Sequence, residues 1–518
     1  MKKLRLPFIT LAFISSLFVS SATAQLSHQQ IDSLVHETMD TFNVPGMAVA
    51  VIKDGEVVHS KGYGIRKVDG KKVDTNTLFG VASNTKAFTS AAIAKLVDQG
   101  KIKWNTHVTD VIPEFKLYNG YITRNFTIRD LLSHRGGLDL GQGDLMVFPP
   151  HNTTDREEMI HNLRYLKPAY SIRSDFRYNN LMFIVAGEIV ERISGMSYER
   201  FVMENFVNPL GMDRTAMNYH KIKNHSNEIT GYVSVDKELL PVDLSFTDIS
   251  NPAAGMWSSV NDMSKWVIAR LNEGRYGPNK EKQLFSEESA EEMWSPQAII
   301  DIKEGGRYNT HFMSYGLGWF LKDVDSYKQV HHTGGLIGIV SKVLMIPDID
   351  LGIVLLTNRM IGAPLTIIPN AIKDSYLGKE PYDWIGEMHK KMEDSKESAN
   401  KVVSEVWETV ESNKEIPNLE DFEGRYNDPW FGDIRIYEKD GGLYFEAKRA
   451  KDFTGELYYY KGDTFVVKWD NRTFMADAYL MFTLDKEGMA NSAEMKPISP
   501  RTDFSFDFKH LHFKRLEE

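Results

Sequence analysis

The sequence predicts an α+β protein in which helices flank an antiparallel sheet, followed by a small C-terminal all-β domain with the character of a barrel. A helix pattern and a hairpin pattern open the chain, and strand patterns return late, between residues 315 and 357. A sheet built from both ends of this region and covered by the intervening helices is therefore expected. From residue 418 onward, only short alternating strand patterns separated by turn residues remain, which is typical of a small barrel or sandwich.

Length, charge and cysteine content narrow the function classes. The 518 residues are too many for one ordinary domain. The net charge of −10 disfavours nucleic acid and an anionic membrane surface as partners. Because the chain contains no cysteine, disulfides, thiolate metal sites and a thiol nucleophile are excluded.

Residues 1–24 have the pattern of a signal peptide. A basic start precedes an apolar run over residues 6–19, and Ala22-Thr23-Ala24 provides a small-x-small cleavage site. The apolar run is short for a spanning helix, which disfavours a membrane anchor. The sequence therefore predicts a periplasmic or secreted protein, with no integral membrane segment once the signal peptide is removed.

The remaining elements follow in order along the chain. An amphipathic helix over residues 26–43 precedes a hairpin formed by residues 45–52 and 56–63. Further helices are expected from Ser83 to about residue 98 and over residues 127–132, 155–166, 181–195, 197–212, 260–271 and 364–377. Strands are expected over residues 315–320, 329–333, 339–346 and 351–357, with Gly334-Gly335 and Pro347-Asp348 as turns. This gives a main domain over residues 25–378, a helical connector over 379–416 and a barrel domain over 417–518.

Residues 79–86 (FGVASNTK) deliver a serine to the start of an apolar helix. Lys86 follows Ser83 by three residues and projects from the same face. At a helix N-terminus, unpaired N–H groups favour the negative charge that an attacked carbonyl oxygen acquires, and a neighbouring amine can accept or stabilise the serine proton. The same Ser-x-x-Lys spacing recurs at Ser234 and Lys237, where no apolar helix follows, so the motif alone also fits an N-capping serine.

Later polar stretches supply further candidates. Tyr178-Asn179-Asn180 precedes a largely buried helix and, alone, would fit a turn and cap. His332-Thr333-Gly334-Gly335 ends a predicted strand. His134 is a candidate base, although a histidine at a helix end beside glycines is more often a cap or a buried hydrogen-bonding group. The pair His331-His332 lacks the spacing of a metal cluster, so no metal and no cofactor is expected.

In this order, the motifs Ser83-Asn84-Thr85-Lys86, Tyr178-Asn179-Asn180 and His332-Thr333-Gly334-Gly335 resemble those of the serine penicillin-recognising family. That family of β-lactamase-like and penicillin-binding-protein-like hydrolases includes class C β-lactamases, D,D-carboxypeptidases, D-aminopeptidases and related esterases. The resemblance covers about residues 31–377, and the tail resembles the lipocalin-like domain of some peptidase-type members.

The resemblance implies a role for each matching residue. Ser83 would be the acylated nucleophile, Lys86 and Tyr178 would share its activation, and Asn180 would hydrogen-bond the substrate. The third motif, with His332, Gly334 and Gly335, would be an edge strand along which substrate lies. The backbone N–H groups of Ser83 and Gly335 would form the oxyanion hole. Whether Lys86 or Tyr178 is the base stays open.

His332 stands where β-lactamases and carboxypeptidases of this family usually carry a lysine that binds the substrate carboxylate. A histidine is largely uncharged near neutral pH, and its presence resembles the D-aminopeptidases and esterases. We therefore expect a secreted serine hydrolase that acts through an acyl-enzyme on esters or on small peptides and amides containing D-residues. The alternatives are a β-lactamase or D,D-carboxypeptidase, and a non-hydrolytic penicillin-binding sensor. The sequence leaves the oligomeric state and the role of the tail open.

Overall fold

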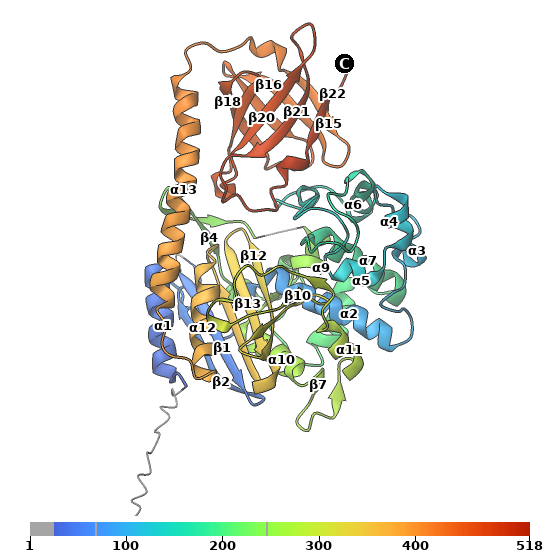
Figure 1. Cartoon of the computed structure of the whole chain (residues 1–518), viewed down its shortest axis with the longest axis vertical. Helices are drawn as coiled ribbons and strands as arrows, with labels where there is room; N and C mark the ends of the chain where they lie inside the picture. The colour runs from blue at the N-terminus through green and yellow to red at the C-terminus, as the bar shows by residue number, and fades with distance from the viewer. Residues whose placement is uncertain (1–24, 68–69, 245–246, 518) are drawn as a thin grey trace, which may run out of the picture.

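The computed structural model describes residues 25–67, 70–244 and 247–517, so the predicted signal peptide lies outside the described residues. A body of helices and sheet lies below a barrel, and the long helix α13 (Trp384–Ser412) runs along one side of the body up to the barrel (Figure 1). Within the described ranges, no helix combines the length and the apolar character needed to cross a bilayer.

The body is built on an eight-stranded sheet with the strand order β2-β1-β14-β13-β12-β11-β10-β9. β1 (Gly46–Lys53) pairs antiparallel with its hairpin partner β2 (Glu56–Gly64) and with β14 (Leu351–Thr357). Strands from both ends of this region therefore close the sheet, as the sequence predicts. Residues 339–346 and 351–357 form β13 (Ile339–Ile346) and β14 with the predicted bounds.

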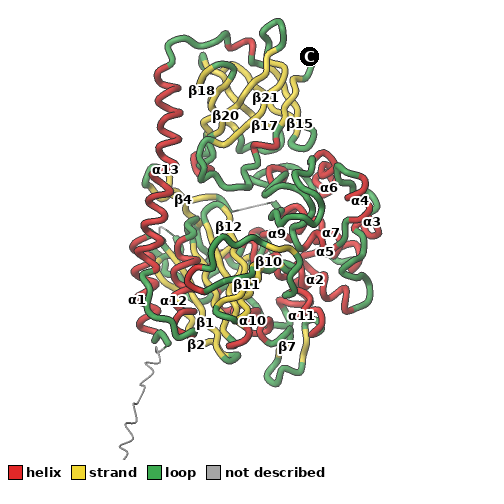
Figure 2. The backbone as a smooth tube through the Cα atoms, viewed as in Figure 1, coloured by secondary structure: helices red, strands yellow, loops and turns green. Residues whose placement is uncertain are grey.

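Helices cover both faces of this sheet, and the burial of β1 shows it. Met47, Val49 and Val51 belong to one apolar cluster with α1 (His28–Thr41) and α12 (Ala363–Tyr376). Ala48, Ala50 and Ile52 belong to a second cluster with α10 (Val260–Leu271). Because alternate residues of a strand point to opposite faces, a strand covered on both sides is apolar throughout. Figure 2 shows the strands between these helices.

The third predicted motif lies in a different local structure from the one expected. Gly334 and Gly335 lie inside β12 (Tyr327–Leu336), paired with Ser341 and Val340, so the predicted turn at this glycine pair is wrong. The turn instead falls at residues 337–338. β12 is also an interior strand rather than the expected edge strand, although its pairing with β11 (Phe320–Val324) stops at His331.

The predicted strand over residues 315–320 is also wrong. Two strands, β10 (Met313–Tyr315) and β11, flank a turn in which Gly318 has a φ of 81°, a conformation that favours glycine. β9 (Ala298–Ile299) pairs with β10 and completes the sheet. The strand-like composition of residues 315–320 concealed the glycine turn, whose residues are buried by tertiary packing.

The helical lobe of the body surrounds α2 (Lys86–Asp98), which is buried over nearly its whole length. α5 (Ile128–Leu132), α7 (Asn180–Ser194) and α9 (Asn251–Ala254) complete its centre. The other helices are α3 (Val108–Val111), α4 (Gly120–Asn125), α6 (Arg156–Asn162), α8 (Tyr198–Val202) and α11 (Glu287–Met293). The helix predicted over residues 197–212 ends as a regular α-helix at Val202 and continues as one π-helical turn to Val207.

Short strand pairs lie outside the large sheet. They are β3 (Phe79–Gly80) with β6 (Trp257–Ser258), β4 (Gly231–Val235) with β5 (Glu238–Val242), and β7 (Arg275–Tyr276) with β8 (Lys282–Gln283). The first pair matters for the site because β3 leads directly into the Ser83 segment.

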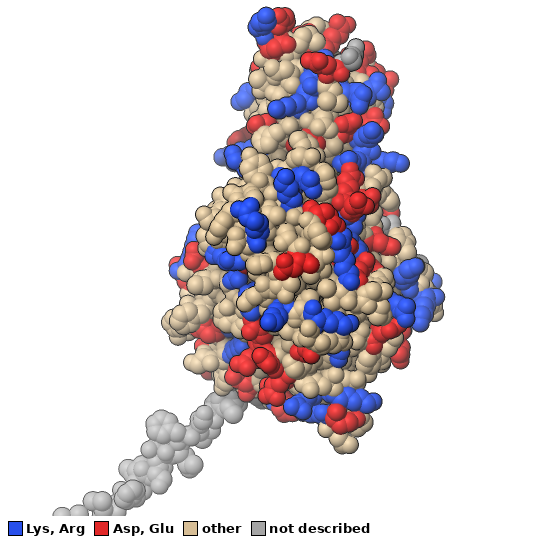
Figure 3. Space-filling model, turned by 90° about the vertical axis from the view of Figure 1, so that its right-hand side faces the viewer, with Lys and Arg blue, Asp and Glu red and all other residues tan. Residues whose placement is uncertain are grey.

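The C-terminal domain is a closed antiparallel barrel in which β15 pairs with β22 and every other strand with its neighbours in sequence. Its strands are β15 (Gly424–Asp428), β16 (Gly432–Lys439), β17 (Gly442–Ala447), β18 (Thr454–Lys461), β19 (Thr464–Trp469), β20 (Ala478–Leu484), β21 (Ala490–Pro497) and β22 (His512–Arg515). Basic and acidic side chains are interspersed over both domains on the face that Figure 3 shows.

The barrel is attached to the helical lobe as well as to α13. Asn162 Nδ2 donates a hydrogen bond to the carbonyl oxygen of Trp430 over 3.1 Å. Lys509 forms an ion pair of 2.6 Å with Asp139. The loop between β21 and β22 also contacts the helical lobe, because Asp507 accepts a hydrogen bond from the Gly143 N–H.

We predict that Gly187→Ala destabilises the helical lobe. A Cβ at Gly187 in α7 would lie 2.2 Å from Cγ of Pro252 in α9, so the two helices must separate. Overpacking of this kind costs about 1–3 kcal/mol, more than the ~0.5–1 kcal/mol that alanine adds to helix propensity. Thermal unfolding measures the difference. Gly120→Ala in α4 is the matched control, because its Cβ would meet only Arg124 Nη1 at 3.5 Å. Equal melting temperatures for the two variants would contradict the prediction.

Candidate active site

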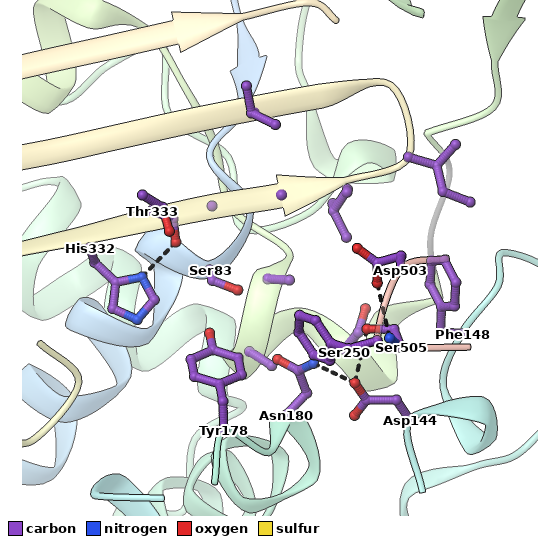
Figure 4. A pocket seen from close by; sticks show the side chains of 18 of the residues that line it. Ser83, Asp144, Phe148, Tyr178, Asn180, Ser250, His332, Thr333, Asp503 and Ser505 are labelled. Carbon is purple, nitrogen blue, oxygen red and sulfur yellow. Dashed lines mark hydrogen bonds between the residues drawn. The ribbon is translucent and has the colours of Figure 1, made fainter. Parts of the chain in front are cut away.

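A cavity of about 530 Å³ lies at the junction of sheet, helical lobe and barrel loop, and the sequence-predicted site residues meet there. Ser83, Tyr178 and Asn180 line it from the helical side (Figure 4). His332, Gly334 and Gly335 line it from β12. Lys86 lies beneath, hydrogen-bonded to Ser83.

Ser83 is held in a short, constrained turn rather than in the α-helix itself. It belongs to the 3-10 helix Ala82–Thr85, and α2 begins at Lys86. Ala82 has a φ of 48°, a left-handed conformation that costs a non-glycine residue free energy and is retained where surrounding contacts enforce it. Asn84 Nδ2 donates to Ser341 Oγ over 2.8 Å, and Ser341 Oγ donates to the Val81 carbonyl over 2.7 Å. β13 thereby anchors the serine turn from both sides.

Gly334 permits the close approach of β12 to this turn. A Cβ on Gly334 would lie 2.2 Å from the Val81 carbonyl oxygen, whereas a Cβ on Gly335 would meet nothing within 4 Å. The first glycine is therefore required by packing. The second faces the open cavity.

Lys86 is completely buried, and its amine has three acceptors. Nζ lies 3.1 Å from Ser83 Oγ, 2.7 Å from Asn180 Oδ1 and 2.9 Å from the Ala253 carbonyl oxygen. Burial lowers the pKa of Lys86 to about 7, although the negative charge of Asp144 opposes this effect. The amine can therefore lose its proton near neutral pH.

The Tyr178 ring lies against Lys86, with Nζ 4.8 Å from the ring centroid. Its hydroxyl points toward Ser83 (Figure 4). Burial raises the pKa of Tyr178 above its ordinary value, and the nearby Ser83 hydroxyl offsets only part of the rise. The resting phenol is therefore protonated at neutral pH.

His332 is buried, and both of its ring nitrogens are engaged within the protein. Nδ1 lies 2.6 Å from the Thr333 carbonyl oxygen, so it carries the proton and Nε2 accepts from the Tyr315 hydroxyl at 2.9 Å. Burial and the nearby Lys86 charge lower the pKa of His332 to about 3. The histidine is neutral, as its sequence position suggested, and forms part of the cavity wall.

His134 lies behind Tyr178, with its ring centroid 4.2 Å from that of the tyrosine. Its Nδ1 accepts a hydrogen bond of 3.1 Å from the backbone N–H of Asn179. Burial lowers the pKa of His134 well below its ordinary value. It is therefore a buried hydrogen-bonding group that holds the Tyr178-Asn179-Asn180 segment, the more common of the two roles weighed from the sequence.

Sequence reasoning missed Asp144 and three residues of the loop between β21 and β22. Asp144 Oδ2 accepts from Asn180 Nδ2 over 2.8 Å and from Ser505 Oγ over 3.0 Å. Burial raises the pKa of Asp144 to about 7. Asp503 and Ser505 line the cavity from the barrel domain (Figure 4), and so does Phe504. An acidic residue within the small and apolar stretch GQGDLMV was a usable signal for Asp144, whereas nothing local connects residue 505 with residue 144.

The cavity lining is largely apolar, and its charged members are acidic. Asp144 and Asp503 are the charged side chains of the lining, and no lysine or arginine of the described ranges belongs to it. The apolar lining residues are Leu140, Val147, Phe148, Phe176, Ile184, Ala253, Ala254, Phe320, Leu336, Ile337, Val340, Met360, Leu365 and Phe504. Among the residues that the structure describes, no cluster of three or more His, Asp or Glu side chains could hold a metal ion.

Comparisons with known proteins agree with this architecture. The Beta-lactamase family model matches residues 31–374, and the model of a domain of unknown function (DUF3471) matches residues 410–515. "Unguisins hydrolase ungD'" of Aspergillus campestris is 27% identical over 441 residues, which is 81% of this chain and 80% of the relative. "Protein flp" of Staphylococcus aureus strain MRSA252 is 30% identical over 338 residues, or 64% of this chain and 63% of the relative.

Two solved structures share the fold. An octameric penicillin-binding protein homologue from Pyrococcus abyssi has a TM-score of 0.61 and 22% identity, and the match covers 94% of this chain and 100% of that one. A class C beta-lactamase has a TM-score of 0.55 and 20% identity, and the match covers 68% of this chain and 96% of that one. With the family model matched across the whole body, this chain belongs to the beta-lactamase family of serine hydrolases.

Proposed function

We propose that the protein is a hydrolase of neutral esters or of small amides and peptides containing D-residues, acting through an acyl-enzyme on Ser83. The observation that carries the proposal is a serine hydroxyl at an apolar cavity with a buried amine 3.1 Å behind it. The pattern of residues 1–24 supports export to the periplasm or exterior. The similarity to a relative named as a hydrolase supports the reaction class.

The geometry suggests how the reaction proceeds. Lys86, in its neutral form, accepts the Ser83 proton as Oγ attacks the substrate carbonyl. The backbone N–H groups of Ser83 and Gly335 stabilise the developing oxyanion. Protonated Tyr178 donates to the leaving group and is reprotonated from Lys86. Water then attacks the acyl-enzyme by the reverse proton transfers and releases the acid. Because the pKa shifts favour a neutral amine and a neutral phenol, Lys86 is the base in this scheme.

Electrostatics favour substrates without a carboxylate beside the scissile bond. Neutral His332 replaces the cation that a carboxylate would need, and the described residues that line the cavity include two aspartates and no lysine or arginine. Arg135, an alternative cation, is paired with Asp130 at 2.8 Å. Lys342, the other alternative, donates to the Leu365 carbonyl over 2.7 Å. β-Lactamase and D,D-carboxypeptidase activities are therefore the less favoured alternatives.

Ser83→Ala is expected to abolish both hydrolysis and covalent labelling, because Ser83 is the one hydroxyl among the described lining residues that is hydrogen-bonded to the buried amine of Lys86. Ser234→Ala is the matched control, since that serine lies on β4 and does not line the cavity. Intact-mass detection of adducts after exposure to activated esters, D-amino-acid amides and β-lactams measures both variants. Turnover by Ser83→Ala, or its loss in folded Ser234→Ala, would reverse the assignment.

Tyr178→Phe is expected to slow acylation by about 10²–10⁴-fold, the usual contribution of a general acid or base. The phenylalanine keeps the ring beside Lys86 and removes only the hydroxyl. Stopped-flow measurement of acylation across pH tests this expectation. An unchanged rate at every pH would show that Tyr178 takes no part in proton transfer and only lines the cavity.

The wild-type enzyme is expected to prefer a methyl ester over the matching free carboxylate. Absence of one charge-assisted contact weakens carboxylate binding by about 1.5–3 kcal/mol, roughly ten- to a hundredfold. His332→Lys should reduce the preference for the methyl ester over the carboxylate. His332→Gln is the control for changes in side-chain packing, because glutamine is neutral. Values of kcat/KM on the two substrates give the comparison. A wild-type preference for the carboxylate that His332→Lys does not increase would favour the β-lactamase or carboxypeptidase alternative.

A further inference from the structure

We propose that the barrel domain takes part in the chemistry through a hydrogen-bonded chain in which Ser505 and Asp144, acting through Asn180, position Lys86 and tune its proton transfer. Ser505 and Asp144 are positioning residues in this proposal, since they act on the reacting atoms through other groups. The inference rests on the proposed role of Lys86 at Ser83, and it assigns a function to a loop that belongs to the other domain.

The chain is continuous from the barrel to the nucleophile. Ser505 Oγ lies 3.0 Å from Asp144 Oδ2, which lies 2.8 Å from Asn180 Nδ2. Asn180 Oδ1 lies 2.7 Å from Lys86 Nζ, which lies 3.1 Å from Ser83 Oγ. Figure 4 shows the Ser505, Asp144 and Asn180 part of this chain beside Ser83.

The polarity of the chain is fixed by its members. When Lys86 is an ammonium and Asp144 a carboxylate, the amide of Asn180 turns its carbonyl toward the lysine and its NH₂ toward Asp144, because an ammonium only donates and a carboxylate only accepts. The amide thus transmits the charge of Asp144 toward Lys86. Ser505 donates to the carboxylate and stabilises its ionised form.

The barrel loop is anchored at this point independently of Ser505. The backbone N–H of Gly143 donates to Asp507 Oδ2 over 2.6 Å. Phe506 packs edge-on against Phe148 with ring centroids 5.1 Å apart. Loss of the Ser505 hydroxyl alone therefore leaves the loop docked, so that substitution tests the hydrogen bond rather than the domain interface.

The charged and titratable groups around Lys86 determine in which direction its pKa moves when the charge of Asp144 is lost. His134, His332 and Tyr178 lie near Lys86, and their burial keeps all of them neutral in the resting site. Asp144 is the nearby group that raises the pKa of Lys86. Removing that negative charge must therefore lower the pH at which Lys86 loses its proton.

The groups around Asp144 predict that loss of the Ser505 hydroxyl also lowers the pKa of Lys86. Hydrogen bonds from Asn180 and Ser505 favour the ionised carboxylate, whereas the nearby Asp507 disfavours it. Without the Ser505 hydroxyl, a smaller fraction of Asp144 is ionised at neutral pH. The effect on Lys86 then has the same sign as removal of the charge, and a smaller size.

The test measures the pH dependence of Ser83 phosphonylation by a small fluorophosphonate. Ser83 Oγ displaces fluoride from phosphorus, its proton passes to Lys86, and intact mass reports the adduct. Ser505→Ala should move the acidic limb of the rate profile to lower pH by about half a unit to one unit. Asp144→Asn should move it further in the same direction. Ser505→Thr, which retains a hydroxyl, should restore the wild-type limb. Ser499→Ala, in the same loop, should leave it unchanged, because the Ser499 hydroxyl accepts from the Arg501 N–H and does not line the cavity.

Two kinds of failure are distinguishable. Absence of wild-type labelling at Ser83 would overturn the proposed function itself. Normal wild-type labelling, with a limb that is unmoved in both Ser505→Ala and Asp144→Asn, would overturn the positioning role alone. A lower rate without a pH shift in folded Ser505→Ala would show a merely structural contact and would also overturn the proposal. Circular dichroism and melting temperature establish folding, and Ser505→Ala decides the outcome if Asp144→Asn does not fold.

Discussion

The buried amine of Lys86 is the group around which the catalytic lobe is organised. A primary amine taken out of water needs acceptors at hydrogen-bond distance, or its burial is strongly unfavourable. Its three acceptors come from separate elements: the Ser83 turn, Asn180 at the start of α7 and Ala253 in α9. These elements must therefore converge, and small residues let them do so: Gly187 admits Pro252 of α9, and Gly334 admits β12 beside the serine turn.

Burial also shifts the pKa values of the titratable groups around the site toward their neutral forms. In the cavity wall and directly behind it, burial brings the pKa of an amine down to about 7 and the pKa of a carboxyl up to about 7, and it keeps two histidines and a tyrosine neutral. The site thus carries little fixed positive charge at the surface that substrate meets. This low positive charge follows from desolvation. It distinguishes the cavity wall at His332, which is neutral, from a wall that carries a charged lysine at this position.

Local pattern and motif order were enough to predict much of the fold from the sequence. The bounds of α10 follow from its apolar periodicity, and those of β13 and β14 from continuous apolar runs that are buried on both faces of the sheet. The order of elements along the chain predicted a sheet that strands from both ends of the region close, and the pairing of β1 with β14 closes it. The predicted turn at Gly334-Gly335 failed because these glycines serve close packing against Val81 rather than a change of chain direction. The strained Ala82 and the approach of Ser505 to Asp144 depend on tertiary contacts between distant segments, which no local pattern encodes.

The pairing of β1 with β14 also affects how the chain folds during its synthesis. These neighbouring strands begin at residues 46 and 351, so the central sheet is incomplete until most of the body has been synthesised. Loop closure over such a separation is entropically costly and slow, and contacts this distant in sequence raise the folding barrier. Until β14 is synthesised, the hairpin of β1 and β2 exposes an apolar edge. The serine turn likewise lacks its hydrogen-bond partner Ser341 until β13 is synthesised. The nascent chain therefore remains without an assembled active site, and in need of protection from aggregation, until its last body strands emerge.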